Sequence, residues 1–256
     1  MIRLFGLLLC AALAWGQRPS DADSAALLAR ARQRALDYAR SLPDFVCSEV
    51  IQRFQASAWV AKLGPWIYDD TLTVKLSYSR GTERHKLELI DGKPTGKVFE
   101  DLEGATSSGE FGGTLRTIFS PDSQASFDWD SAKTVHGRHV AIYQYAVSAA
   151  KSPYTLEHRS IRDVVGLHGT VEVDRETGEV WQLTFIAYDI PQRLDMQSFS
   201  SSVEYALANV AGRNYLLPAR SESETHSTQM WARNKMEFRN YRKFSADSSI
   251  DFGSGK

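Results

Sequence analysis

The residues best suited to chemistry in this sequence are six histidines, two cysteines and several paired aspartates. His136 and His139, in "HGRH", are the closest pair of histidines. Residues three apart on a strand face opposite sides, and Gly137 favours a turn between them. A zinc site needs three or four ligands that converge on one point. We therefore expect no metal site and no cofactor.

Covalent catalysis would need a nucleophile beside a base. The serine motif Gly-x-Ser-x-Gly is absent from the sequence. Cys47 could in principle pair with His85 or His168. Its apolar neighbours in "DFVCSEV" would raise the pKa of the thiol, so the pattern favours a buried, unreactive side chain.

Paired aspartates are compatible with glycoside hydrolysis, which uses two facing carboxyl groups. The candidate pairs are Asp69 with Asp70, and Asp128 with Asp130. The first pair follows "GPWIY", where a solvated turn is the simpler explanation. A secreted hydrolase is therefore an alternative that these residues do not favour.

The first sixteen residues, "MIRLFGLLLCAALAWG", have the layout of a secretory signal peptide. A basic start at Arg3 precedes an apolar run, and small residues precede a cleavage site before Gln17. The run is shorter than the roughly 20 apolar residues that span a bilayer. We expect an exported chain, periplasmic or extracellular, with no transmembrane segment after residues 1–16 are removed.

Composition indicates a globular chain with a substantial core, because 43% of the residues are hydrophobic and 24% are charged. Lys and Arg total 30 against 31 Asp and Glu, a net charge of −1. This balance gives no basic surplus for binding nucleic acid. Removal of the leader would leave Cys47 as the lone cysteine, which excludes a disulfide within one chain.

One helix is predicted over about residues 21–42. Ser20, Asp21 and Ser24 are candidate N-caps, and Pro43 follows the helix. Its apolar face is formed by Leu28, Ala35, Ala39 and Leu42.

After Pro43 the sequence predicts antiparallel strands. Residues 71–78 alternate between apolar and polar side chains, as a half-buried strand does, and glycine-containing turns separate later segments. A Gly- and Ser-rich loop, residues 106–124, interrupts the series with a helical turn expected at 114–119. We predict a mainly β, α+β fold: one large curved antiparallel sheet in a single domain, residues 17–244, with the helix and the loop packed on it. Residues 245–256 are expected to form a flexible tail.

The segment "VWQLTFIAYDI", residues 180–190, is apolar at positions that point to both sides of a strand. A half-solvated strand has one polar face, so we expect both faces to be covered. The helix and the loop would cover one face, and more protein or a ligand would cover the other. The candidate ligand-lining residues are Trp181, Leu183, Phe185, Ile186 and Tyr188.

Two motifs carry a family resemblance: "VEVDRETGEVWQLTF", and the later "GRNYLLPARSE". With a leader, a helix and a long antiparallel series before them, they resemble the LolA/LolB-like superfamily of periplasmic lipoprotein carriers and related lipid-handling domains. The resemblance implies an incomplete β-barrel whose concave side holds acyl chains. The carriers have an early arginine-proline motif, whereas Gly81 follows Arg80 here, so no functional arginine is carried over to Arg80 or Arg84.

The last predicted strand carries several basic residues on one face: Arg233, Lys235, Arg239 and Lys243. Such a face typically protects a solvated sheet edge, and it also suits anionic headgroups or an acidic partner.

The leading hypothesis is thus a noncatalytic exported binding protein that holds an acyl chain or a lipidated protein. The alternative is an envelope protein-interaction or stress-sensing module that binds a protein partner and no lipid.

Overall fold

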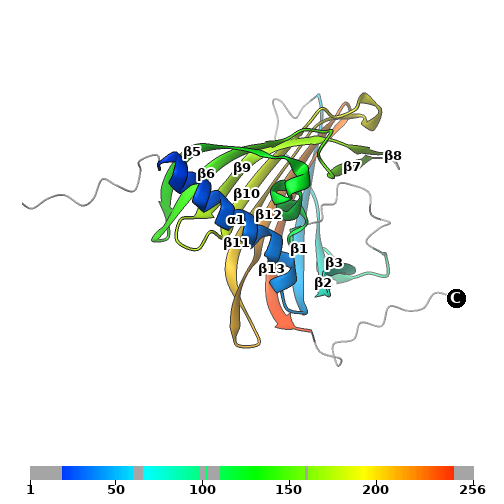
Figure 1. Cartoon of the computed structure of the whole chain (residues 1–256). Helices are drawn as coiled ribbons and strands as arrows, with labels where there is room; N and C mark the ends of the chain where they lie inside the picture. The colour runs from blue at the N-terminus through cyan, green and yellow to red at the C-terminus, as the bar shows by residue number, and fades with distance from the viewer. Residues whose placement is uncertain (1–18, 60–65, 99–101, 103–109, 159–160, 245–256) are drawn as a thin grey trace, which may run out of the picture.

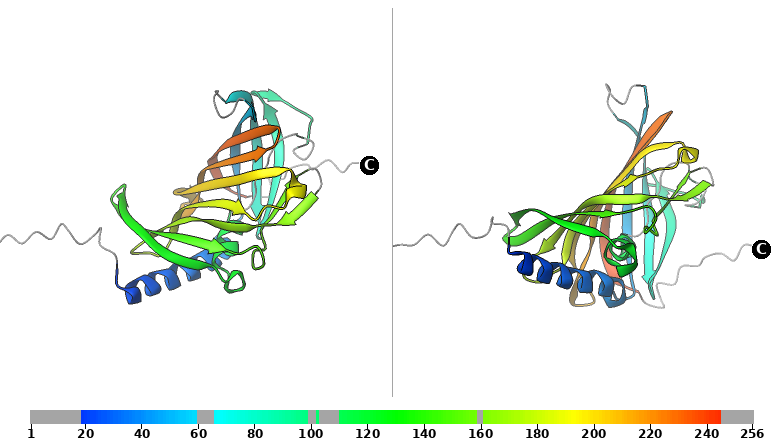
Figure 2. Two further views of the ribbon diagram at one scale, coloured as in Figure 1. Left: turned by 90° about the horizontal axis from the view of Figure 1, so that it is seen from above. Right: turned by 45° about the horizontal axis from the view of Figure 1, so that its top comes forward.

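The structure is a computed structural model, and it describes residues 19–59, 66–98, 102, 110–158 and 161–244. Its main feature is one curved, open antiparallel sheet with two helices on its concave side (Figures 1 and 2). The predicted fold is confirmed: mainly β, with an N-terminal helix and a central helical turn on a large sheet. The predicted leader and tail lie outside the described residues.

Eleven strands of the described chain form this sheet, in the order β4-β3-β2-β1-β13-β12-β11-β10-β9-β6-β5. The strands are β1 (Phe45–Ser57), β2 (Ile67–Ser79), β3 (Thr82–Ile90), β4 (Lys93–Pro94), β5 (Ser126–Val135), β6 (Arg138–Val147), β9 (Gly166–Asp174), β10 (Val180–Tyr188), β11 (Met196–Val210), β12 (Arg213–Ser227) and β13 (Met230–Lys243). A separate hairpin joins β7 (Thr155–His158) and β8 (Ile161–Val164).

The pairing of β1 with β13 joins the first and the last strand of the described chain in the interior of the sheet. It corrects one expectation, because β13 is not an edge strand but lies between β1 and β12. The free edges in the described residues belong to β4 and β5. As a result β12 is the middle strand, with five strands on each side.

The tight turns between strands explain why the hairpins could be predicted. Asp91 and Gly92 have φ angles of 49° and 73°, and His136 and Gly137 have 49° and 77°. Two successive residues with positive φ are typical of the two-residue turns that match the twist of antiparallel strands.

Helix α1 (Asp21–Ser41) begins at Ser20, whose Oγ accepts a hydrogen bond from the backbone N–H of Asp23 at 3.2 Å. Its buried residues are Leu27, Ala31 and Ala35. The hydroxyl of Tyr38 donates to the backbone oxygen of Leu216 on β12 at 2.9 Å, so the helix is fastened across the concave face. No helix in the described part of the chain is long and apolar enough to cross a membrane.

The shorter helix α2 (Gly113–Phe119) packs beside α1 and buries Leu115, Ile118 and Phe119. A single-turn helix, η2 (Pro121–Ser123), follows α2, and another, η3 (Gln192–Leu194), precedes β11. The segment before α2 also reaches the sheet, because the hydroxyl of Tyr205 on β11 donates to the backbone oxygen of Glu110 at 3.0 Å.

The buried apolar residues form two clusters. The first lies under α1 and α2 against β6, β9, β10 and β11, and the second lies against β1, β2 and β13. Strand β10 differs from its prediction: Leu183, Phe185 and Ala187 are buried in the first cluster, but Ile186 on the opposite face is 43% exposed. The convex face of β10 is therefore not covered by a second apolar layer, and Gln182 and Thr184 share that face.

Candidate functional site: a polar seam on the concave face

The middle strand β12 is polar on both faces between residues 220 and 225. Ser221 and Ser223 point to the concave side and are 4% and 3% exposed. Glu222 and Glu224, which alternate with them, point to the convex side. The inward face of an antiparallel sheet is normally apolar, so hydroxyl groups at the centre of this sheet require an explanation.

The strands on either side of β12 continue this polar region. Ser201 on β11 pairs with Ser223, and Ser223 pairs with Asn234 on β13. Both Ser201 and Asn234 are buried, with 6% and 4% exposure. We call these four concave-side residues, Ser201, Ser221, Ser223 and Asn234, the polar seam.

Apolar walls flank the polar seam on both sides. On β11, Phe199, Val203 and Tyr205 belong to the first apolar cluster. On β13, Met236 and Phe238 belong to the second. The seam therefore separates two apolar surfaces on one face of the sheet, an arrangement that suits a molecule with both an apolar and a polar part.

Glu49 on β1 adds a buried carboxyl group to the concave face, with β13 between it and Ser221. It pairs with Phe238 of β13 and with Val74 of β2, on the same face as Ile51 and Met236. Glu49 is 4% exposed, and its Oε2 atom has no hydrogen-bond partner among the described residues, although Nε2 of His85 lies 3.7 Å away. Burial, together with the nearby carboxyl groups of Glu110 and Glu83, raises the pKa of Glu49 to about 8.

Ser221 shares this lack of a partner. Its Oγ atom is buried and accepts or donates no hydrogen bond within the described structure. A buried hydroxyl group without a partner costs about 1–3 kcal/mol. Most buried polar atoms in folded proteins are satisfied, so two unsatisfied atoms on one concave face are consistent with a polar ligand group that would pair with them.

The nearest cation on this face is already engaged. Arg53 on β1 lies opposite Asn234, and two of its nitrogens donate to the carboxylate of Asp70 at 2.6 Å each. Its Nη2 atom also lies 3.8 Å from Asp69. The guanidinium group is thus neutralised by two carboxylates.

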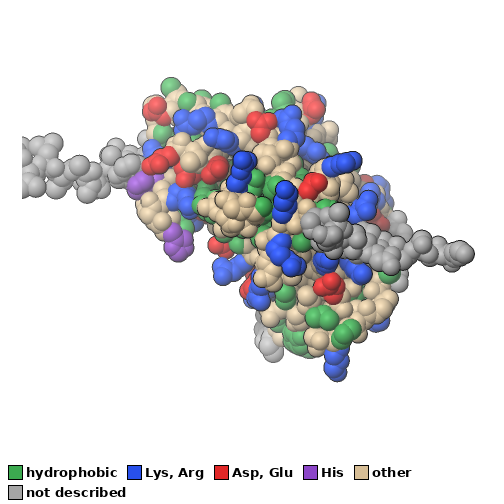
Figure 3. All heavy atoms as spheres, turned by 90° about the horizontal axis from the view of Figure 1, so that it is seen from below, with side chains coloured by type: hydrophobic (Ala, Val, Ile, Leu, Met, Phe, Trp, Pro, Cys, Tyr) green, Lys and Arg blue, Asp and Glu red, His purple; other side chains and the backbone are tan. Residues whose placement is uncertain are grey.

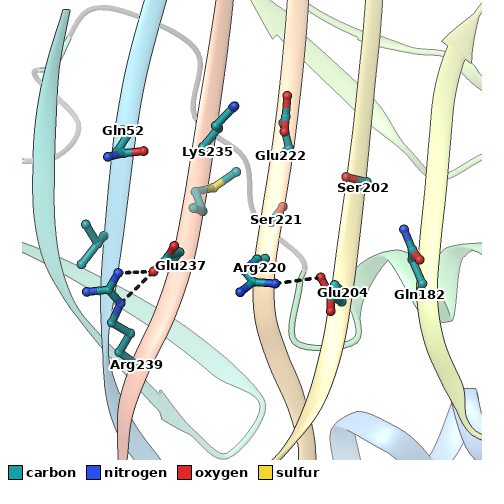
Figure 4. Close-up of a pocket in the computed structure, with 12 residues that line it drawn as sticks. Gln52, Gln182, Ser202, Glu204, Arg220, Ser221, Glu222, Lys235, Glu237 and Arg239 are labelled. Carbon is teal, nitrogen blue, oxygen red and sulfur yellow. Dashed lines mark hydrogen bonds and ion pairs between the residues drawn. The ribbon is translucent and has the colours of Figure 1, made fainter. Parts of the chain in front are cut away.

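The convex face above β12 carries a shallow, open depression of about 270 Å³ (Figure 4). Three carboxylates and three cations line it: Glu204, Glu222, Glu237, Arg220, Lys235 and Arg239. Arg220 pairs with Glu204 at 3.6 Å, and Arg239 pairs with Glu237. This balance indicates a solvated sheet face without a strong charge of one sign.

The molecule seen from below likewise shows Lys and Arg side chains with acidic side chains among them (Figure 3). On β13, Arg233 donates to Glu224 at 2.7 Å and Arg239 pairs with Glu237, so the predicted basic face also carries carboxylates.

The five candidate ligand-lining residues do not lie together on one face. Leu183 and Phe185 are buried on the concave side, and Phe185 contacts the ring of Phe199 with centroids 5.8 Å apart. Ile186 and Tyr188 are on the convex side, where Tyr188 lies over Gly166. Trp181 lies at an irregularity of β10, beneath the guanidinium group of Arg138 at 3.2 Å. Ligand contact stays a prediction for all five, and a concave site would use only Leu183 and Phe185.

The candidate catalytic residues are also separated. Cys47 is buried, and burial raises the pKa of its thiol strongly. The register places Leu76 between Cys47 and His85, while His168 is on β9. His139 contacts the hydroxyl of Thr134 at 3.1 Å. In the described residues no three His, Cys, Asp or Glu side chains gather as a metal site requires.

Three of the paired aspartates, Asp69, Asp70 and Asp130, have other partners, and Asp128 is exposed. Asp69 and Asp70 face Arg53. On β5, Asp130 accepts hydrogen bonds from Ser131 and Gln144, both at 2.7 Å, and these bonds lower its pKa.

Sequence reasoning did not identify the polar seam or Glu49. The available signal was "RSESET", a stretch that is polar at every position although it directly follows the apolar "LLPA". In "VCSEVI", Glu49 likewise lies on the same face of the strand as Cys47 and Ile51. Neither signal could be interpreted without knowing that β12 and β13 are interior strands.

Comparison with known proteins finds several solved structures that are similar to this chain. No family model matches the sequence, and no curated protein matches it. A LolA superfamily protein from Nitrosomonas europaea is 9% identical and matches over 89% of this chain and 98% of its own, with a TM-score of 0.37.

Two further solved structures are similar to the chain. A DUF1329 family protein from Desulfovibrio piger is 10% identical over 89% of this chain and 95% of its own, with a TM-score of 0.41. A putative outer membrane lipoprotein-sorting protein domain from Vibrio parahaemolyticus is 11% identical over 88% and 94%, with a TM-score of 0.37. Two of these names, the LolA superfamily protein and the lipoprotein-sorting domain, agree with the resemblance seen in the sequence.

Proposed function

We propose that this chain is an exported, noncatalytic binding protein that holds an amphipathic molecule with an acyl chain on its concave face. The ligand would be a lipid or the lipidated end of a protein. The observation that carries the proposal is the polar seam, buried between two apolar walls at the centre of an open sheet. The leader-like residues 1–16 support export.

Physical chemistry links this arrangement to such a ligand. An acyl chain that leaves water for the apolar concave side contributes about 25 cal/mol per Å² of its own apolar surface removed from water. The polar end of the same molecule would supply hydrogen bonds to Ser221 and Glu49, which lack them in the described structure. Apolar surface therefore supplies affinity, and the polar seam sets the position of the polar end.

Titration of palmitoyl glycerol into the full chain without its leader tests the proposal. Replacing Ser221→Ala together with Ser223→Ala removes two seam hydroxyls without adding volume. We expect affinity to fall about tenfold, which corresponds to about 1.4 kcal/mol.

The matched control is Ser202→Ala, which removes a hydroxyl from the convex face of β11 between two concave positions. Binding by this control should equal that of the native chain. Equal affinity of the seam variant and the native chain would refute the assignment of the site.

A further inference from the structure

Glu49 and Ser221 together indicate which kind of polar group the concave face accepts. Both have a buried polar atom without a hydrogen-bond partner in the described chain, and both lie on the concave face with β13 between them, Ser221 opposite Met236 and Glu49 opposite Phe238. Their surroundings are otherwise apolar, since Ile51, Met236 and Phe238 belong to one buried cluster.

A negatively charged group would be disfavoured at this position. Arg53, the cation that faces the seam, is held by Asp70 in two hydrogen bonds of 2.6 Å. Carboxyl groups approach from two other elements: Glu110 from the segment before α2, and Glu83 from β3. A ligand carboxylate would gain no free cation and would meet these acidic groups.

A positively charged group would be disfavoured for a different reason. It would have to lose its hydration in a buried, apolar environment, and it would need an ionised carboxylate in return. The environment of Glu49 favours the neutral carboxyl group, because burial raises its pKa to about 8. A neutral carboxyl group is a hydrogen-bond donor to an uncharged acceptor.

We propose that the concave site selects an acyl chain whose polar end is uncharged, an ester, amide or alcohol, and that Glu49 and Ser221 form hydrogen bonds with that end. This inference rests on the proposed function and specifies its ligand. Glu49 acts through its O–H group, and Ser221 through its hydroxyl.

Three ligands with the same chain length separate the possibilities at about pH 7: palmitoyl glycerol, palmitate and hexadecylamine. We expect palmitoyl glycerol to bind at least about tenfold more tightly than either charged ligand. Equal or tighter binding of palmitate or hexadecylamine would overturn the selectivity and leave the proposed function intact. If none of the three binds, the proposed function and this inference both fail.

The pH dependence gives a second readout. The titratable groups that approach Glu49 are Cys47, Glu83, His85, Glu110 and Tyr241. Raising the pH through the value of about 8 ionises Glu49 and removes its O–H donor. The native chain should therefore lose affinity for palmitoyl glycerol as the pH rises through that value.

Glu49→Gln keeps an uncharged donor of the same shape at every pH. This variant should bind palmitoyl glycerol with nearly native affinity at neutral pH and should show no loss as the pH rises. If native and Glu49→Gln chains have the same pH profile, Glu49 does not contact the ligand and the inference is overturned.

Discussion

The Ser221 side chain at the centre of the sheet lowers the stability of the ligand-free protein, and this effect can be measured. Ser221 is 4% exposed, and its hydroxyl has no partner among the described residues. An apolar methyl group of smaller size would avoid the loss of hydration that this hydroxyl suffers on folding. We therefore expect the Ser221 hydroxyl to stabilise the ligand-bound protein and to destabilise the ligand-free protein.

We predict that Ser221→Ala raises the free energy of unfolding by about 1 kcal/mol in the absence of ligand, because an unsatisfied buried hydroxyl is removed. Urea-induced unfolding, followed by tryptophan fluorescence, would measure the change. Ser202→Ala, on the convex face, should change it by less than about 0.5 kcal/mol. Destabilisation by Ser221→Ala would mean that the hydroxyl has a structural partner.

Among the elements, α1 determines how much of the concave face is covered. Small residues let it lie close to the sheet: Ala31 is fully buried and Ala35 is 4% exposed. A Cβ atom at Gly178, in the turn before β10, would lie 3.0 Å from the Cβ of Arg30. The helix is thus packed closely at its middle, and near its C-terminal end Tyr38 forms a hydrogen bond to β12.

Ala31→Leu should overpack this contact and lower the free energy of unfolding by about 1–3 kcal/mol. Ala29→Leu places the same side chain on the exposed face of the same helix and should have little effect. Thermal unfolding of both variants would test the comparison. A stable Ala31→Leu chain would show that α1 can shift on the sheet.

The elements that were predicted most closely, α1 and the hairpins, are those marked by local sequence patterns. A cap, an apolar face and a following proline delimit α1, and turns such as Asp91-Gly92 delimit hairpins. By contrast, the pairing of β1 with β13 joins residues far apart in the sequence, and no local pattern specifies it. That pairing makes β12 the middle strand, which is why the seam residues Ser221 and Ser223 could not be recognised from the sequence.

In the whole molecule, the open sheet and the polar seam at its centre are both explained by a ligand on the concave face. The sheet is open, with free edges at β4 and β5 (Figure 2), and on its concave side the helices and Leu156 of the β7–β8 hairpin pack in the first apolar cluster. The convex side has balanced charges, so we expect the ligand to be recognised by the concave face. The predicted absence of a charged nucleic-acid surface stays a prediction from composition.

Native mass spectrometry of residues 17–256, purified from an exporting host without detergent, would show most directly whether the protein holds a lipid. Organic extraction should then identify the bound species. We expect a stoichiometric adduct that extracts as a lipid with an uncharged polar end and is depleted in the chain with Ser221→Ala and Ser223→Ala. A clean mass of the chain alone, with no adduct after palmitoyl glycerol is added, would contradict it and favour a module that binds a protein partner.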